Sequence, residues 1–164
     1  YVGRTFIEPT QSIRSLGVKL KLSSTKTIVK DKKIILIDDS LVRGTTCHKI
    51  VKMLYESGAK EVHVRIACPE IKYPDFYGVD MPTKEELLAY KKNNQEMCNY
   101  IKSKSLKFLS LKGLYKALIG SERNSNYPQF SDHYFTGDYP IKPYDNLNGF
   151  KIKQLSLLSG KSNN

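Results

Sequence analysis

The sequence predicts an α/β fold in which a parallel sheet is flanked by helices. The run Lys33–Ile37 is continuously apolar after its lysine and rich in β-branched residues, which is typical of a central strand buried on both faces of a parallel sheet. A short loop, apolar residues at helical spacing and a second apolar strand follow, and this order predicts a right-handed βαβ unit. With 164 residues, of which 40% are apolar, the chain is long enough for one domain with a substantial core.

The residues before this unit are polar and basic. Glycine, proline and a Ser/Thr cluster interrupt any long periodicity in residues 1–32, so we expect a mobile loop there. Within it we expect an entry strand or turn over Tyr1–Ile7 and a short strand over Lys26–Val29. The chain has no initiator Met, and we expect it to be a fragment of a longer protein.

The βαβ unit continues with a helix and a second strand. Thr45 or Thr46 can act as the N-cap of the helix, and Gly58 is suited to end it. Its apolar face is predicted from residues spaced three and four apart: Cys47, Ile50, Val51 and Leu54. The second strand is predicted over Glu61–Ala67.

The rest of the chain is predicted to alternate short elements with loops. Pro69–Pro82 is a loop with aromatic residues, and Thr83 begins a helix with Glu86 at capping-box spacing. Further short elements are predicted: a helix over Asn94–Lys102, a strand over Phe108–Leu109 and a helix over Leu111–Leu118. From Ser121 the chain is rich in Asn, Ser, Tyr and Pro, and we expect an extended C-terminal tail.

The net charge of +11 indicates an anionic partner. The positive residues are concentrated directly before the first strand: Arg14, Lys19, Lys21, Lys26, Lys30, Lys32 and Lys33. Nucleic acid, a small phosphorylated ligand and a plain basic surface are all compatible with this charge. We favour the small anionic ligand over nucleic acid because no nucleic-acid motif accompanies the charge.

Cysteine and histidine are too scattered for a disulfide framework or a zinc site. The residues concerned are far apart: Cys47, Cys68, Cys98, His48, His63 and His133. We therefore expect a reducing, cytoplasmic location. No apolar run approaches the roughly 20 residues that span a bilayer, and no signal-peptide pattern is present, so no membrane association is expected.

The segment after the first strand carries residues suited to a phosphorylated sugar. Asp38 and Asp39 are predicted to emerge at the carboxyl edge of the sheet, where open α/β sheets bind ligands. The free N–H groups of the next helix point into the same crevice, where a phosphate can bind with added donors from Ser40, Thr45 and Thr46. The carboxylates would repel a phosphate, but they can accept hydrogen bonds from ribose hydroxyls or bind Mg²⁺. The competing interpretation is a capped surface helix that follows a core strand.

The string IILIDDSLVRGTT at residues 34–46 resembles the 5-phosphoribosyl-1-pyrophosphate (PRPP) signature of type I phosphoribosyltransferases. With YVGRTFI at 1–7, FYGVDMP at 76–82 and FTGDYP at 135–140, the chain is similar to the glutamine phosphoribosylpyrophosphate amidotransferase family. The resemblance implies part of a type I phosphoribosyltransferase fold over residues 1–120, with the first part of that domain missing, and a C-terminal extension over 121–164. The glutaminase domain of the family is also missing, so we expect the chain alone to be inactive with glutamine.

The resemblance also assigns roles to residues. Asp38 and Asp39 would contact the ribose hydroxyls and Mg²⁺. The 5′-phosphate would be held by the following positions: Ser40, Arg43, Gly44, Thr45 and Thr46. Arg4 and Lys21 would belong to a flexible loop that closes over PRPP, although both could also be plain surface charge.

The activity implied is transfer of ammonia from glutamine to PRPP with loss of pyrophosphate, which forms 5-phosphoribosylamine in the first step of purine synthesis. Purine nucleotides would be feedback inhibitors, and the full-length protein would be a homo-oligomer. Some members of the family carry an iron–sulfur cluster held by a Cys-x-x-Cys pair before FTG-x-YP. Tyr127–Tyr134 contains no Cys, so no cluster is expected. A non-catalytic PRPP-binding regulator and a ribose-phosphate pyrophosphokinase remain as alternatives.

Overall fold

The computed structural model describes residues 26–78 and 83–141. Its centre is a three-stranded sheet in the order β1 (Lys33–Asp38), β2 (Glu61–Ile66) and β3 (Ser105–Phe108). Both pairs of neighbouring strands are parallel, and Asp38, Ile66 and Phe108 lie side by side at the carboxyl edge. The predicted parallel sheet is therefore confirmed.

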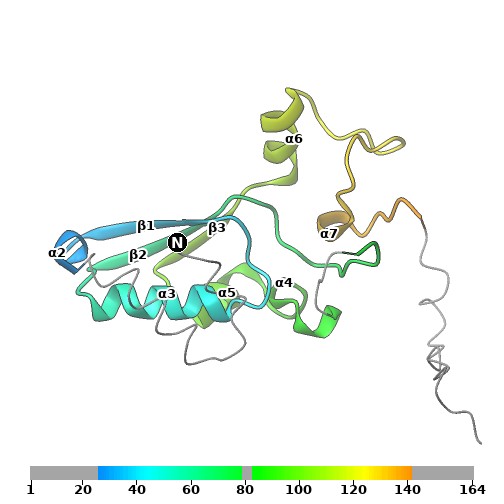
Figure 1. The fold of residues 1–164 in the computed structure, drawn as a ribbon. Helices are drawn as coiled ribbons and strands as arrows, with labels where there is room; N and C mark the ends of the chain where they lie inside the picture. Colours follow the sequence, from blue (N-terminus) through cyan, green and yellow to red (C-terminus); the bar gives the residue numbers. More distant parts are fainter. Residues whose placement is uncertain (1–25, 79–82, 142–164) are drawn as a thin grey trace, which may run out of the picture.

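One face of the sheet packs against α3 (Thr45–Glu56) and α5 (Asn94–Ile101), which run beneath it in Figure 1. The core between these layers is apolar because alternate residues of each strand point toward the helices. Its fully buried members come from the strands and both helices: Val51, Val62, Val64, Met97, Ile101 and Leu106. The predicted helical face of α3 is confirmed, since Cys47, Val51 and Leu54 are buried and Ile50 is partly buried against the core.

The opposite face of β1 is exposed, which corrects the prediction of a central strand buried on both faces. Ile35 and Ile37 are 64% and 72% exposed, and β1 lies at the edge of the sheet within the described residues. A continuous apolar run shows that both faces of a strand are apolar. It does not show whether another segment of the chain, or a partner, covers each face.

The segment predicted as a strand at Lys26–Val29 is instead a single helical turn, α2. Among the described strands none lies beside it. The turn closes when the Lys32 N–H donates to the Val29 carbonyl, with Asp31 at φ 61°. Val29 is buried at 3% exposure, so the apolar residue that favoured a strand packs on the core from a helix. Tyr1–Ile7 lies outside the described residues.

Two predicted caps differ from the structure. Neither Thr45 nor Thr46 caps α3; Gly44 is the N-cap and no side chain accepts a capping hydrogen bond. Thr83 precedes a 3₁₀ turn, η1 (Lys84–Glu86), and makes no side-chain cap. The capping box that does form was not predicted, and it lies at the start of α5, where Asn93 and Glu96 exchange hydrogen bonds.

The remaining elements are short. After η1 comes α4 (Leu88–Lys91), and after β3 comes α6 (Leu111–Ile119), which confirms the predicted helix there. The predicted strand at Phe108–Leu109 overlaps β3 by one residue only. The strand ends at Phe108 because Ser110 caps α6 by accepting from the Gly113 N–H.

The predicted extended tail contains one helical turn, α7 (His133–Thr136), followed by Gly137 in the left-handed region. This turn is attached to the body of the protein by buried polar contacts. His133 Nε2 lies 2.8 Å from Asp75 Oδ1, and Arg123 donates to Asp132 over 2.6 Å. Residues 121–132, by contrast, form no helix or strand, as predicted.

Candidate functional site

The residues predicted to bind a phosphorylated sugar lie in one pocket at the carboxyl end of β1. The pocket has a volume of about 410 Å³ and is lined by Asp38–Cys47 together with Ile50. All of the predicted ligand residues between β1 and α3 are therefore brought together. The two predicted residues of the flexible loop, Arg4 and Lys21, lie outside the described residues.

The acidic end of the pocket is formed by the two aspartates. Asp38 is half-buried, and its Oδ1 accepts a hydrogen bond of 3.1 Å from the Asp39 N–H. Asp39 is exposed and accepts 2.9 Å from the Ser40 hydroxyl. Burial raises the pKa of Asp38, the hydrogen bond from Asp39 N–H opposes this, and the neighbouring Asp39 charge adds to the rise. A cation or hydroxyl donors at this point would relieve the unfavourable carboxylate environment.

The other end of the pocket is the N-terminus of α3. Gly44 has φ 74° and ψ −6°, and its carbonyl accepts the first helical hydrogen bond, from His48 N–H at 2.9 Å. The N–H groups of the first helical turn have no acceptor within the helix, and no acidic residue occupies this turn. Thr45 and Thr46 are exposed and line the same pocket. These donors and the positive end of the helix dipole are suited to a phosphate.

Arg43 lines the pocket, but its side chain makes a contact that the sequence did not predict. Its Nε donates to Glu86 Oε2 over 2.6 Å, across 43 residues of sequence. Both side chains are about half exposed. The sequence pattern indicates only a capping role for Glu86, so its link to the loop after β1 comes from the tertiary structure.

The cysteines nearest the pocket are not poised as nucleophiles. Burial, with the Asp38 charge adding to it, raises the pKa of Cys47 to about 12. Burial and the Asp39 charge raise the pKa of Cys68 to about 11. A nucleophilic cysteine needs a lowered pKa, and Cys98 is a free, buried thiol in the core.

The two carboxylates of the pocket fit Mg²⁺ only if a substrate supplies further oxygen ligands. No group of three or more His, Cys, Asp or Glu side chains that could hold a metal ion occurs in the described part of the chain. Mg²⁺ is commonly bound by one or two carboxylates together with substrate phosphates, and Asp38 and Asp39 supply that number. The observation that supports the fit is the adjacent pair of carboxylates, with the Asp38 pKa already raised.

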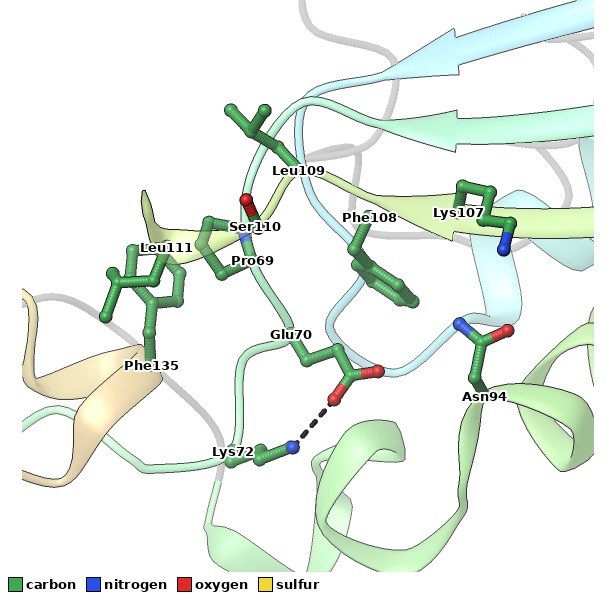
Figure 2. A pocket seen from close by; sticks show the side chains of 10 residues that line it. All are labelled: Pro69, Glu70, Lys72, Asn94, Lys107, Phe108, Leu109, Ser110, Leu111 and Phe135. Carbon is green, nitrogen blue, oxygen red and sulfur yellow. Dashed lines mark ion pairs between the residues drawn. The ribbon is translucent and has the colours of Figure 1, made fainter. Parts of the chain in front are cut away.

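A second pocket of about 370 Å³ lies along the same sheet edge, between the ends of β2 and β3 (Figure 2). Its lining mixes charged, polar and apolar side chains: Pro69, Glu70, Lys72, Asn94, Lys107, Phe108, Leu109, Ser110, Leu111 and Phe135. Glu70 and Lys72 pair with each other at 2.7 Å. None of the residues predicted to bind a ligand lines this pocket.

Comparison with known proteins gives consistent results. The chain is 53% identical over 160 residues to the amidophosphoribosyltransferase of Rhizobium etli, covering 97% of this chain and 32% of that protein. It is 52% identical over 145 residues to the amidophosphoribosyltransferase of Staphylococcus aureus strain Mu50, covering 88% of this chain and 29% of that protein. No profile of a known protein family matches the chain.

A solved structure agrees. The glutamine PRPP amidotransferase from B. subtilis, complexed with ADP and GMP, superimposes with a TM-score of 0.70 at 42% identity, covering 89% of this chain and 32% of that one. The chain thus spans about a third of the length of the relatives it matches.

The parallel sheet and the aspartate-ended strand that leads into a helix N-terminus define a type I phosphoribosyltransferase fold, as predicted. Within that class the resemblance is confirmed at family level: the chain is homologous to amidophosphoribosyltransferases over nearly all of its length. In the described residues, no helix is long and apolar enough to cross a membrane.

Proposed function

We propose that the complete protein containing this chain is an amidophosphoribosyltransferase. It transfers ammonia derived from glutamine to PRPP, releases pyrophosphate and forms 5-phosphoribosylamine, the first step of de novo purine biosynthesis. The observation that carries the proposal is the single pocket that gathers the motif residues, in a chain 53% identical to the Rhizobium etli enzyme.

The two ends of the pocket match the two ends of the substrate. The Asp38 and Asp39 carboxylates accept hydrogen bonds from the ribose hydroxyls. The 5′-phosphate binds at the N-terminus of α3, where it is held by the first-turn N–H groups and by hydroxyl and cationic side chains: Ser40, Arg43, Thr45 and Thr46. Gly44 allows the phosphate to approach the backbone. Holding both ends orients C1 of the ribose.

The reaction needs orientation and charge stabilisation more than covalent chemistry by the protein. The ammonia nitrogen forms a bond to C1 while the bond from C1 to the pyrophosphate oxygen breaks, and the electron pair leaves with pyrophosphate. Mg²⁺, held by Asp38 and Asp39 together with the substrate, would neutralise charge on the leaving group when bound. Arg4 and Lys21, in a loop that closes over PRPP, would add positive charge there and exclude water.

Other parts of the activity are assigned outside these residues. Glutamine hydrolysis belongs to a further domain of the complete protein, because the described cysteines are buried or have raised pKa values. The B. subtilis relative was solved with ADP and GMP, so purine nucleotides are the proposed inhibitors here as well. The complete protein is proposed to be a cytoplasmic homo-oligomer that carries no iron–sulfur cluster.

The proposal is tested by titrating the complete protein with Mg·PRPP in a calorimeter and repeating the titration with Asp38→Asn/Asp39→Asn. We expect the dissociation constant to rise at least about tenfold, because hydrogen bonds to charged groups contribute about 1.5–3 kcal/mol each. A matched variant, Glu56→Gln/Glu122→Gln, removes two exposed carboxylates far from the pocket and should bind as wild type does. Unchanged binding by the aspartate variant would refute the assignment.

The same preparation separates an enzyme from a non-catalytic regulator. Pyrophosphate release from Mg·PRPP should depend on added ammonium, which bypasses the need for glutamine. Tight binding without ammonium-dependent pyrophosphate release would instead identify a regulator.

A further inference from the structure

The segment Leu41–Gly44, named here the phosphate loop, belongs to no helix or strand, so its shape depends on its neighbours. Leu41 is 2% exposed and anchors one end in the core. The Val42 carbonyl accepts a 2.9 Å hydrogen bond from the Leu88 N–H, the first residue of α4. A backbone group of the loop is therefore held by an element 46 residues further along the chain.

The last residue of the phosphate loop rests on side chains from α4 and α5. A Cβ atom on Gly44 would lie 2.7 Å from Leu88 Cδ2 and 3.1 Å from Tyr100 Cε1. Tyr100 is itself tied to α3, since its carbonyl lies 2.9 Å from His48 Nδ1. Leu88 and Tyr100 thus form a surface against which the backbone of the phosphate loop is packed.

The third contact is the ion pair between Arg43 and Glu86. The 2.6 Å hydrogen bond directs the Arg43 side chain toward η1. Its partner, Glu86, lies two residues before Leu88 in the sequence. Three consecutive residues of the phosphate loop are therefore each held by a distant residue. Val42 is hydrogen-bonded to Leu88, and Arg43 is paired with Glu86. Gly44 packs on Leu88 and Tyr100. These contacts are a backbone hydrogen bond, an ion pair and a close packing contact, which differ in chemistry and all fix the same loop.

We propose that Glu86 and Leu88 are positioning residues of the PRPP site: they hold the phosphate loop in the shape that receives the 5′-phosphate before the substrate arrives. This inference rests on the proposed function and adds residues outside the PRPP motif to the site. Glu86 acts through Arg43 and does not itself touch the substrate. A loop held in its binding shape loses less conformational freedom when it binds, which strengthens binding.

The test is a cycle of variants in the complete protein: Glu86→Gln, Arg43→Gln and the two together. Glu85→Gln is the matched control, because Glu85 is an exposed acid of the same 3₁₀ turn and makes no ion pair with any other residue that the structure describes. We expect Glu86→Gln to raise the dissociation constant of Mg·PRPP by about threefold to fivefold, the upper range for an exposed ion pair. Arg43→Gln should raise it at least about tenfold, because this variant also removes a cation from the phosphate end of the pocket. The double variant should bind no more weakly than Arg43→Gln alone, because Glu86 acts through Arg43, while Glu85→Gln binds as wild type.

Three results of the cycle would overturn the inference. Glu86→Gln that binds as wild type shows that the ion pair does not matter. Glu86→Gln that binds more tightly shows that Glu86 competes with the phosphate for Arg43. Effects that multiply in the double variant show that Arg43 and Glu86 act separately.

Amide hydrogen exchange of the ligand-free protein tests the positioning role without PRPP. Exchange at Val42–Gly44 should be about threefold to fivefold faster in Glu86→Gln than in Glu85→Gln, with unchanged melting temperature. If wild type fails to bind Mg·PRPP, the proposed function fails, and the exchange result still decides whether Glu86 orders the loop. Equal exchange in the two variants overturns the positioning role.

Discussion

Gly44 combines two constraints that a side chain would violate. Its φ of 74° lies in the left-handed region, and a Cβ would approach Leu88 Cδ2 to 2.7 Å. Gly120 has a similar φ of 69°, but a Cβ there would meet open space. Comparing an alanine substitution at each glycine therefore distinguishes the free-energy cost of the left-handed backbone, which both carry, from the cost of a steric clash, which only Gly44 carries.

Gly44→Ala is expected to weaken Mg·PRPP binding at least about tenfold and to destabilise the protein more than Gly120→Ala does. Left-handed backbone in a residue other than glycine costs about 1–3 kcal/mol, and both variants carry that cost. Only Gly44→Ala must also displace Leu88, and with it the Val42 carbonyl. Urea unfolding and calorimetric titration of both variants measure the difference. Equal losses in the two variants would mean that the collision does not shape the loop.

Among the elements, α7 is attached to the rest of the protein by buried charged and polar side chains. Asp132 is 4% exposed and accepts hydrogen bonds from Tyr115 Oη at 2.8 Å and from Arg123 Nε at 2.6 Å. Next to it, His133 pairs with Asp75, so that residues 123–138 are attached both to α6 and to the loop after β2. Burial by itself would raise the pKa of Asp132, but the hydrogen bonds from Arg123 and Tyr115 outweigh it and hold that pKa below its ordinary value.

Arg123→Gln is expected to destabilise this segment by about 3 kcal/mol at neutral pH, because it leaves a buried carboxylate without its cation. Since the folded pKa of Asp132 is lowered, its stabilisation is complete above the ordinary carboxyl pKa and is lost as the pH falls through the lowered value. The difference in unfolding free energy between wild type and Arg123→Gln should therefore shrink below about pH 4. Denaturant titrations across this range measure it.

The control for the Arg123 variant is Lys112→Gln, which removes an exposed partner of Glu122 and should have little effect at any pH. A difference between wild type and Arg123→Gln that stays constant into the acid range would show that Asp132 is not the group responsible.

At the scale of the whole molecule, the two ends of the pocket come from separate elements of one βαβ unit. Asp38 ends β1, Thr45 begins α3, and residues of α4 and α5 pack against the loop between them. A ligand that contacts both ends binds only when β1 and α3 are in their folded arrangement. Its binding free energy therefore adds to the free energy of unfolding.

Mg·PRPP at about 100 times its dissociation constant is expected to stabilise the complete protein by about 2.7 kcal/mol. A thermal or denaturant melt with and without ligand measures this, and Asp38→Asn/Asp39→Asn should lose most of the stabilisation at the same ligand concentration. Mg²⁺ alone and inorganic pyrophosphate with Mg²⁺ are the controls. A shift of equal size with pyrophosphate would show that the ribose end of the pocket contributes nothing.

Local features of the sequence predicted most of the fold because they act over short distances. The β-branched run predicted β1, the spacing of apolar residues predicted the buried face of α3, and Gly58 predicted its end. The motif also predicted which residues share a pocket, since a strand end and the helix start that follows it must lie together. The ligand roles of the pocket residues, the roles of Arg4 and Lys21 and the domain boundary after residue 120 stay predictions.

What only the tertiary structure decided involves residues far apart in sequence. Arg43 could not be paired with Glu86, nor Val42 with Leu88, until α4 was packed beside the phosphate loop. The predictions for the second face of β1 and for Lys26–Val29 were wrong for the same reason. Apolar residues indicate burial, but the tertiary structure determines which element packs on them and in what conformation they are buried. The sequence by itself thus determined a PRPP motif on a strand–loop–helix unit. The tertiary structure decided what holds that loop in place, because contacts between distant segments exist only once the chain has folded.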